Sequence, residues 1–370
     1  MTGPGASPAT GPEPHPALCT RLCAAVGIRY PIVQTGMGWV AGARLVAATA
    51  QAGALGILAS ATMSFEQLER AIGDVRARTD APFGVNMRTD VPDVARRVDL
   101  LVDQGVRVAS FAQAPRPETV SRLRDAGIFV IPTVGARRHA EKVATWGVDG
   151  VIAQGAEGGG HTGQVPTSLL VPQVVDAVGD TLSVIGAGGF NDGRGLVAAL
   201  AWGAQGIAMG TRFLLTQEST VPDEVKKVYL GTPITGTVVT TSVDGAPQRV
   251  VRTDLVDHLE GAGRLSALPR ALRNALAFRR ETRTSMAALM REGAAMKKGN
   301  ELSWAQVIMA ANAPMMTRAA LVEGRTDVGV LPTGQVVGVI EELPTVSELV
   351  ARIVTEANDT LARLCAGGAG

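Results

Sequence analysis

The sequence predicts an α/β fold, a (β/α)8 TIM barrel that carries an inserted, mostly helical lid segment. From about residue 17 to residue 213, short apolar stretches alternate with amphipathic, alanine-rich stretches. Most of the amphipathic stretches end in Gly or Ala-Gly, which is typical of helix C-termini. Eight strand candidates in regular alternation with helices favour a closed barrel over an open sheet. An open doubly wound sheet is the alternative, but no GxGxxG follows the first strand candidate.

The strand candidates are short apolar runs of the kind that form buried parallel strands. They cover residues 31–33, 54–58, 82–86, 106–110, 128–131, 150–153, 183–186 and 206–209. The helix candidates between them cover residues 43–52, 64–78, 91–104, 116–126, 136–146, 171–178 and 193–202. Five of these helix candidates are followed directly by a glycine suited to end a helix, namely Gly53, Gly105, Gly127, Gly147 and Gly203.

The alternation ends after Phe213. Residues 232–252 are rich in Thr, Val and Gly, which predicts an extended stretch or a hairpin, and residues 255–316 read as mostly helical. A last helix is expected over 347–364. The predicted organisation is therefore a disordered tail over 1–16, the barrel over 17–220, a helical lid over 221–330 and a closing part of the barrel over 331–370.

The composition is that of an ordinary globular protein. The 370 residues are 46% hydrophobic and 19% charged, with a formal net charge of +1. A charge near zero gives no indication of a nucleic acid or a membrane surface as partner, and no apolar run reaches membrane-spanning length. The three cysteines have neither disulfide-framework nor metal-ligand spacing, which fits a reducing cytoplasm. The Pro-, Gly- and Ala-rich N-terminus lacks the features of a signal peptide.

A glycine-rich stretch after the sixth strand candidate carries the first chemical signal. It contains Gly158-Gly159-Gly160-His161. Three consecutive glycines allow the backbone to lie flat against a ligand, and histidine is the side chain best suited to move protons near neutral pH. The alternative is a glycine-rich turn with a solvent-facing histidine.

Two further glycine loops follow the seventh and eighth strand candidates, where barrels favour phosphate. They are 186–189 and 209–212, and each offers backbone N–H groups that an anion can approach. The first loop, from Gln34 to Gly38, and Asn86 lie on the same rim. The Asn86 amide is able to bind the edge of a planar ring, although Asn is also a common turn residue. The residues thus point to a barrel that holds a phosphorylated cofactor with His161 near its reactive face.

The remaining candidate residues carry weaker signals. His15 lies in the expected tail, His139 in a helix beside two arginines, and His258 in the lid segment. The methionines at 309, 315 and 316 recur at helical spacing, which is more typical of a core than of a cofactor contact. No His, Cys, Asp and Glu cluster has metal-ligand spacing.

Taken together, these motifs resemble the nitronate monooxygenase (2-nitropropane dioxygenase) superfamily, which also contains the flavin-type enoyl-[acyl-carrier-protein] reductases. The resemblance covers nearly the whole chain from about residue 17. It is carried by residues 31–40, 84–86, 158–163, 187–189 and 209–213, and by a late Gly334-Gln335 pair.

The resemblance implies a TIM barrel that binds FMN without a covalent bond. Carried over residue by residue, the isoalloxazine would be contacted by Gln34, Thr35, Gly36 and Met37, and its polar edge by Asn86. The phosphate would be held by Gly188, Gly189, Gly210 and Thr211. His161 would be the acid/base residue beside the flavin, with Gln154, Gly159 and Gly160 also in contact with the cofactor.

The first loop, Thr-Gly-Met-Gly-Trp, is more similar to the reductases than to the nitronate monooxygenases. Residues 41–45, 57–63 and 214–216 resemble actinobacterial members that degrade the last two steroid rings. This likeness implies a cytoplasmic oxidoreductase of steroid (cholesterol) degradation that acts on a hydroindane-carboxyl-CoA thioester with NADH or NADPH as electron partner. It leaves a homodimer open.

Three alternatives remain from the same residues: a nitronate monooxygenase, an enoyl-[acyl-carrier-protein] reductase, and a flavin- or partner-binding barrel without turnover. Five arginines of the lid segment are candidates for the phosphates of CoA or of a nicotinamide cofactor, although they also fit a solvated helix face. They are Arg270, Arg273, Arg279, Arg280 and Arg283.

Overall fold

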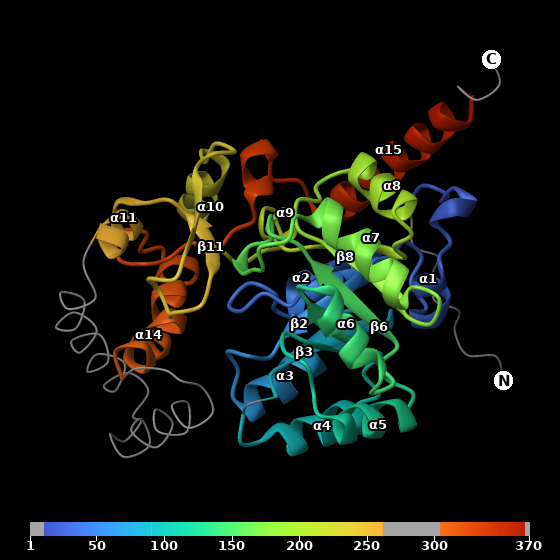
Figure 1. Ribbon diagram of the computed structural model, residues 1–370, viewed down its shortest axis with the longest axis horizontal. Coiled ribbons are helices and arrows are strands. Elements are labelled where there is room, and N and C mark those ends of the chain that lie inside the picture. The colour runs from blue at the N-terminus through green and yellow to red at the C-terminus, as the bar shows by residue number, and fades with distance from the viewer. Residues whose placement is uncertain (1–10, 90, 262–303, 367–370) are drawn as a thin grey trace.

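The computed structural model describes residues 11–89, 91–261 and 304–366 (Figure 1). Its centre is a closed barrel of eight parallel strands in the order β1-β2-β3-β4-β5-β6-β8-β9. The strands are β1 (Ile32–Gln34), β2 (Leu55–Ala59), β3 (Phe83–Met87), β4 (Val108–Phe111), β5 (Phe129–Val134), β6 (Gly150–Gln154), β8 (Ser183–Ala187) and β9 (Gly206–Met209).

Closure of the barrel comes from the pairing of its first and last strands. In β1 and β9, Ile32 pairs with Ile207 and Val33 with Ala208, both in parallel register. The predicted TIM barrel is confirmed, and the open sheet is excluded by this pairing. All eight predicted strands are present within a few residues of the expected positions.

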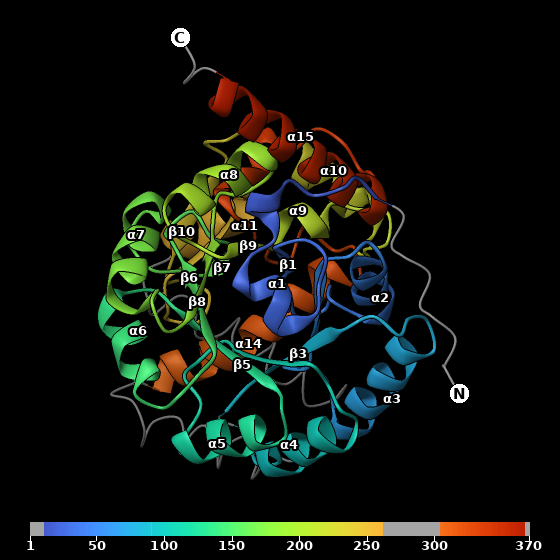
Figure 2. The same cartoon turned by 90° about the vertical axis from the view of Figure 1, so that its right-hand side faces the viewer.

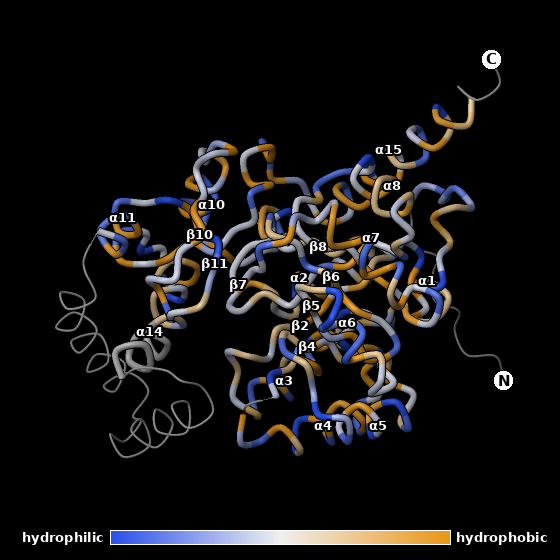
Figure 3. The backbone as a smooth tube through the Cα atoms, in the orientation of Figure 1, coloured by the Kyte–Doolittle hydropathy of each residue, from blue (hydrophilic) through white to orange (hydrophobic). Residues whose placement is uncertain are grey.

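The helices form a ring around the strands, as Figure 2 shows in the turned view. They are α2 (Ala43–Gln51), α3 (Phe65–Arg76), α4 (Val94–Asp103), α5 (Pro117–Asp125), α6 (Arg137–Ala144), α7 (Thr167–Val178), α8 (Gly193–Ala201) and α15 (Val346–Ala366). Hydrophilic and hydrophobic residues alternate along helices such as α4 and α5 (Figure 3), because one face packs on the barrel and the other faces water. The helix α15 packs against α8 and α2 and so completes the ring.

The inside of the barrel is filled with side chains rather than open. One apolar cluster includes Val33, Ile57, Ile131 and Ile185 from the strands. The same cluster takes in Leu22 of α1 (Arg21–Val26), which closes one end of the barrel. A second, larger cluster lies between strands and helices. Ligands must therefore bind outside the packed interior, at the loops on the carboxyl ends of the strands.

The chain leaves the barrel after β9 and rejoins the ring of helices at α15, and residues 331–345 form the returning chain that leads to it. The described part of this excursion contains α9 (Thr211–Leu214), α10 (Asp223–Leu230), β10 (Thr237–Thr240), β11 (Gln248–Val251), α11 (Asp254–Gly261), α14 (Trp304–Leu321) and η2 (Gln335–Val339). The strands β10 and β11 pair antiparallel, so the extended stretch expected over 232–252 is a hairpin. The elements α10, β10, β11, α11 and α14 lie on one side of the barrel (Figure 1). Its role as a lid, and the boundaries at 221 and 330, stay predictions.

Residues 11–16 differ from the expected disordered tail, because hydrogen bonds tie them to the barrel. The Tyr30 hydroxyl donates to the carbonyl of Pro12 at 2.7 Å. The backbone N–H of His15 donates to Asn358 at 2.9 Å, and the Asn358 amide donates to the carbonyl of Glu13 at 2.8 Å. The short helix η1 (Pro16–Leu18) follows directly. Residues 1–10 of the expected tail lie outside the described residues.

Candidate active site

The first loop packs against the third and eighth loops at the rim of the barrel. A side chain on Gly36 would collide with Asn86, and one on Gly210 would come within 3.3 Å of the Thr35 hydroxyl and 3.4 Å of the Met37 sulfur. The Asn86 amide also donates to the Ser110 hydroxyl at 3.3 Å. The structure thus brings together residues that the sequence placed on a common rim.

Gln34, at the end of β1, is fully buried at this rim. Its amide nitrogen donates to the carbonyl of Ile57 at 3.2 Å and to the carbonyl of Thr35. Its carbonyl oxygen is buried and has no hydrogen-bond partner among the described residues. A buried acceptor without a partner costs stability, so Gln34 is suited to accept a hydrogen bond from a bound ring.

The loop after β8 has a backbone that only glycine adopts readily. Gly188 and Gly189 have φ angles of +99° and +81°, in the left-handed region. A Cβ on Gly188 would lie 2.9 Å from the Thr167 hydroxyl and 3.0 Å from the backbone nitrogen of Gly158. This close approach brings the loop after β8 next to the glycine-rich loop after β6.

Thr211, after β9, connects this region to the returning chain. Its hydroxyl oxygen accepts from the backbone N–H of Gly334 at 2.9 Å and from the hydroxyl of Thr333 at 3.4 Å. Its own hydroxyl proton therefore remains available to donate to a ligand. A side chain on Gly159 would come within 2.5 Å of the Gly334 nitrogen. We call the loops around Gly188, Gly189, Gly210 and Thr211 the cradle.

Glu157 holds the glycine-rich loop in place through both its side chain and its backbone. Its carboxylate accepts from the backbone N–H of Thr167 at 2.9 Å and from the Thr167 hydroxyl at 2.6 Å, at the start of α7. Its backbone carbonyl accepts from the N–H of Gln335 at 2.9 Å. Glu157 directly precedes the motif Gly158-Gly159-Gly160-His161, and its anchoring role was not predicted from the sequence.

The histidine at the end of this loop lies on a short strand rather than in a free turn. The strand β7 (Gly160–His161) pairs antiparallel with β11, so that His161 faces Gln248 and Gly160 faces Arg249. The Gln154 amide donates to the carbonyl of His161 at 2.7 Å. The excursion therefore holds the histidine loop by a three-stranded sheet of order β10-β11-β7.

The imidazole of His161 pairs with a carboxylate of the excursion. Its Nε2 lies 2.7 Å from Oδ2 of Asp244, which follows β10. The His161 side chain is 67% exposed, whereas that of Asp244 is 11% exposed. The hydrogen bond that His161 donates to Asp244 raises the pKa of His161, against the opposing effects of partial burial and of the charge on Arg88. Burial acts to raise the pKa of Asp244, but its contacts with His161 and with the N–H of Ala246 make the net shift downward.

An arginine fastens the hairpin to the glycine-rich loop. The guanidinium of Arg249 donates to the carbonyl of Ala156 through Nε at 3.3 Å and Nη2 at 3.1 Å, and to the Thr237 hydroxyl at 2.9 Å. Burial lowers the pKa of Arg249, and the charge of Glu157 opposes that shift. Arg249 and Asp244 together link the excursion to the loop that carries His161.

The other candidate residues for proton transfer have different tasks. His258 donates through Nδ1 to the carbonyl of Asp254 within α11, and His15 caps η1. Tyr229 is fully buried, donates to the carbonyl of Pro332 at 3.0 Å, and has a pKa raised by burial. The Thr162 hydroxyl donates to the carbonyl of Gly155 at 3.0 Å. Thr162 shares the loop that carries His161, but a hydroxyl is a far weaker base than an imidazole near neutral pH.

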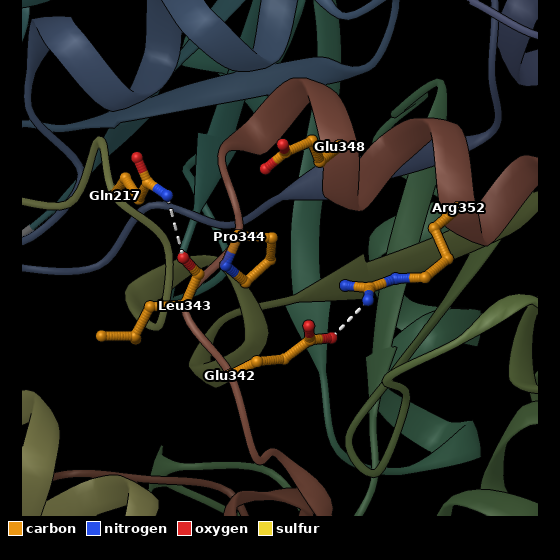
Figure 4. A pocket seen from close by; sticks show the side chains of 6 residues that line it. All are labelled: Gln217, Glu342, Leu343, Pro344, Glu348 and Arg352. Carbon is orange, nitrogen blue, oxygen red and sulfur yellow. Dashed lines mark hydrogen bonds and ion pairs between the residues drawn. The ribbon is translucent and has the colours of Figure 1, made fainter.

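Two hollows lie away from the cradle. One of about 620 Å³ is lined mainly by apolar residues after β3 and on α4, among them Val91, Pro92 and Val98, with Arg116 and Arg122 also in its wall. The other, of about 400 Å³, is shown in Figure 4. Its wall is occupied by internal contacts, namely the Glu342–Arg352 ion pair and the Gln217 amide that donates to the carbonyl of Leu343 at 3.2 Å.

Residues that sequence reasoning missed lie mostly far from the motifs. Asp244 and Arg249 come from the hairpin, and Thr333 from the returning chain, 122 residues from its partner Thr211. The late Gly334-Gln335 pair was the sequence signal that pointed to the returning chain. Five lid arginines named as phosphate candidates lie outside the described residues. Within the described ranges, no group of three or more His, Cys, Asp or Glu side chains could hold a metal ion, and no helix is long and apolar enough to cross a membrane.

Comparison with known proteins places this site in a family. The family model described as "Nitronate monooxygenase" matches residues 19–98 and 91–356. The solved structure of FabK from Thermotoga maritima superposes with a TM-score of 0.76 and 32% identity, over 94% of this chain and 98% of that chain.

Two curated relatives share a higher sequence identity with this chain. A protein of Mycobacterium tuberculosis named (3aS,4S,5R,7aS)-5-hydroxy-7a-methyl-1-oxo-octahydro-1H-indene-4-carboxyl-CoA dehydrogenase is 57% identical over 341 residues, which are 92% of this chain and 96% of the relative. A protein of the same name from Rhodococcus jostii is 56% identical over 340 residues, again 92% of this chain and 96% of the relative.

The rim and the cradle fit the flavin that such proteins use. The cradle is lined by glycine backbone, whose N–H groups a phosphate can approach closely, and Gln34 offers a buried acceptor at the end of β1. The family model spans the loops after β1, β3, β6, β8 and β9 as well as the returning chain. The chain belongs to the nitronate monooxygenase family, whose members are flavin-dependent oxidoreductases.

Proposed function

We propose that the chain is an FMN-dependent oxidoreductase that transfers a hydride and a proton at the α- and β-carbons of a CoA thioester. The two relatives support this substrate class, because both carry the name of an indene-carboxyl-CoA dehydrogenase and match nine-tenths of the chain. The proposed substrate is a hydroindane-carboxyl-CoA thioester from the breakdown of steroid C and D rings. NADH, or NADPH, is the proposed electron partner.

One observation carries the proposal: the exposed imidazole of His161 ends the same glycine-rich loop whose beginning borders the cradle. A Cβ on Gly188 would touch the backbone of Gly158 in this loop. A cofactor with its phosphate in the cradle would therefore extend along Gly158 to Gly160 toward His161. In this proposal His161 is therefore the proton-transfer group beside the cofactor.

The chemistry follows from the thioester. A thioester carbonyl acidifies its α-carbon, so that a positioned base can remove the α-proton. FMN, when bound, supplies the hydride acceptor or donor for the β-carbon. In this proposal His161 takes the α-proton in the dehydrogenation direction and returns it in the reduction direction. The hydrogen bond to Asp244 raises the pKa of His161 and so strengthens it as a base.

The remaining residues hold and orient the cofactor in this proposal. Gln34, Thr35, Gly36 and Met37 contact the ring system, and Asn86 binds its polar edge. The phosphate lies among Gly188, Gly189, Gly210 and Thr211, whose hydroxyl proton is available to donate. Gln154 shapes the loop through the carbonyl of His161, while Gly159 and Gly160 leave room for the ring.

The partners in this proposal are small molecules, with neither nucleic acid nor membrane. We place the enzyme in the cytoplasm, where free thiols such as that of Cys19 stay reduced, and propose a homodimer as its assembly. The five lid arginines stay candidates for the phosphates of CoA or of the nicotinamide cofactor.

A second candidate function is nitronate oxidation with O2, favoured by the family model that bears this name. The enoyl-[acyl-carrier-protein] reductase alternative is favoured by the likeness to FabK. Nitronate oxidation needs no nicotinamide, and the reductase activity needs a carrier-protein thioester. The two alternatives and the proposal therefore differ in the compounds that change the flavin.

Anaerobic mixing experiments distinguish the proposed function from nitronate oxidation. The flavin-loaded protein is mixed separately with a hydroindane-carboxyl-CoA thioester, NADH and an alkyl nitronate while the visible absorbance of the flavin is followed. We expect rapid bleaching with the thioester or NADH and none with the nitronate. Rapid bleaching by the nitronate alone would instead identify a nitronate monooxygenase. Mass spectrometry of the cofactor released by heat is expected to show FMN, and FAD or no flavin would contradict the cofactor assignment.

A further inference from the structure

We infer that Asp244 is the positioning residue of His161: by accepting the Nε2–H of the imidazole, it leaves Nδ1 as the atom that takes the substrate proton. This inference deepens the proposed function and rests on it for the identity of the substrate. The Nε2 to Oδ2 distance is 2.7 Å, within the range of a charge-assisted hydrogen bond. No hydrogen bond to Nδ1 occurs within the described residues, and the side chain is mostly exposed.

The carboxylate of Asp244 is itself held in one orientation. Its second oxygen, Oδ1, accepts from the backbone N–H of Ala246 at 3.0 Å. The turn is closed by the N–H of Gly245, which donates to the carbonyl of Thr241 at 2.9 Å, and Gly245 has a φ of +89° that favours glycine. The two oxygens of Asp244 therefore have different fixed partners, a backbone N–H and the imidazole.

The tautomer of His161 follows from the charge state of Asp244. The pKa of Asp244 is lowered overall, so the group is an ionised carboxylate at neutral pH. A carboxylate only accepts hydrogen bonds, which requires Nε2 to carry the proton and leaves the lone pair on Nδ1. When Nδ1 takes a proton from the α-carbon, the C–H electron pair stays on that carbon and is delocalised into the thioester carbonyl. The imidazolium that forms is stabilised by the adjacent carboxylate.

Gln248 and Arg88 also affect the pKa values of this pair. Gln248 of β11 is paired with His161 across the sheet, so both side chains lie on the same face. Its amide lies close enough to lower the pKa of Asp244, although its Nε2 lacks hydrogen-bond geometry to any described residue. Arg88, after β3, opposes protonation of His161 through its positive charge. Asp244 outweighs it, because the pKa of His161 is raised overall.

The competing explanation is that the pair only fastens the hairpin to the barrel. The variant Asp244→Asn separates the two explanations, because it keeps the shape of the side chain and an oxygen for the Ala246 N–H. With that oxygen occupied, the amide N–H2 faces Nε2 and donates to it, which places the imidazole proton on Nδ1. A structural pair would survive this change, whereas a positioned base would lose its acceptor atom.

The first measurement is NMR of ¹⁵N-histidine-labelled protein, which does not depend on the substrate. The His161 signals are assigned by their loss in His161→Gln, since the chain has four histidines. We expect the Nε2–H tautomer in the wild type, and in Asp244→Asn a shift to the Nδ1–H tautomer with a lower pKa. The control Asp257→Asn removes another carboxylate of the excursion, one that pairs with Arg252 at 2.8 Å, and should change neither. An unchanged tautomer and pKa in Asp244→Asn would overturn the inference.

The second measurement is the pH dependence of turnover. We expect Asp244→Asn to lower kcat by about 10- to 100-fold, the loss typical when the hydrogen-bond partner of a metal-ligating histidine is removed, with flavin content kept. Asp244→Glu retains the negative charge, so we expect it to be more active than Asp244→Asn. Its pH profile should have an apparent pKa near that of the wild type. If Asp244→Asn fails to fold, Asp244→Glu alone tests the point, since loss of the wild-type tautomer there would also contradict the inference. If the wild type does not turn over the thioester, the proposed function fails while the NMR result still decides the role of Asp244.

Discussion

The cradle and the His161–Asp244 pair are built in opposite ways. The cradle consists of backbone and small residues, each directly after the barrel strand that positions it, at Gly188, Gly189, Gly210 and Thr211. The pair consists of two side chains 83 residues apart, one from a barrel loop and one from the excursion. The cradle requires that side chains be absent, whereas the pair requires two specific side chains. Cofactor retention and proton transfer should therefore be separable by mutation.

The largest expected effect comes from adding a side chain at Gly159. A Cβ there would come within 2.5 Å of the Gly334 nitrogen, and backbone cannot move aside cheaply. We expect Gly159→Val to lose most of its FMN, measured as the ratio of flavin to protein absorbance. Gly160→Val meets nothing within 4 Å but has a φ of +63°, so the strain of a left-handed residue should weaken FMN binding less severely.

The control for this prediction is Gly73→Ala, since a Cβ at Gly73 on α3 meets nothing within 4 Å. This variant should keep its flavin and gain slightly in stability, because alanine favours a helix over glycine by about 1 kcal/mol. Full FMN retention by Gly159→Val would show that the glycine loop does not border the cofactor.

The next largest effect is the pH dependence of activity that the His161–Asp244 pair produces. Because Asp244 raises the pKa of His161, the apparent pKa in the pH profile of activity should lie above the usual histidine value of about 6.5. In the dehydrogenation direction the base must be neutral, so kcat/KM should fall about tenfold per pH unit below this apparent pKa. In the reduction direction the imidazolium is required, so activity should fall as the pH rises through the same value. If activity instead changed with pH in the same sense in both reaction directions, His161 would not be the group that transfers the proton.

The smallest effect is expected at a position that belongs to neither region. Ser64 and Gln67 form a capping box at the start of α3. Ser64→Ala should lower the free energy of unfolding by about 1 kcal/mol, measured by chemical denaturation. Flavin content and turnover should not change, because the helix lies outside both regions. Loss of flavin in this variant would show that global stability, rather than local geometry, controls cofactor retention.

The barrel could be predicted from the sequence because its signals are local. Buried parallel strands read as short apolar runs, and glycines mark the helix ends, as at Gly53 and Gly203 with φ of +85° and +88°. The start of α7 was expected at residue 171 but lies at Thr167. Proline is common in the first turn of a helix, and here Pro172 lies inside the helix instead.

The candidate site could be predicted only in part, for the same reason. The glycines of the cradle stand directly after strands, so their place on the rim follows from barrel topology. Asp244 could not be found, because the pairing of β7 with β11 depends on how an excursion folds back over the barrel. Arg249 and Thr333 were missed likewise, since each contacts a loop that is distant in the sequence.

The most direct test of the account is His161→Ala, assayed for FMN content and for turnover of the CoA thioester in the same preparation. The cradle does not use the imidazole, so FMN content should equal that of the wild type. Turnover should fall by about 10² to 10⁴-fold, as for other general acid–base groups. This fall corresponds to an increase of roughly 3 to 5 kcal/mol in the activation free energy. Near-wild-type turnover with FMN bound would contradict the central claim that the cofactor is held by backbone and the proton is moved by His161.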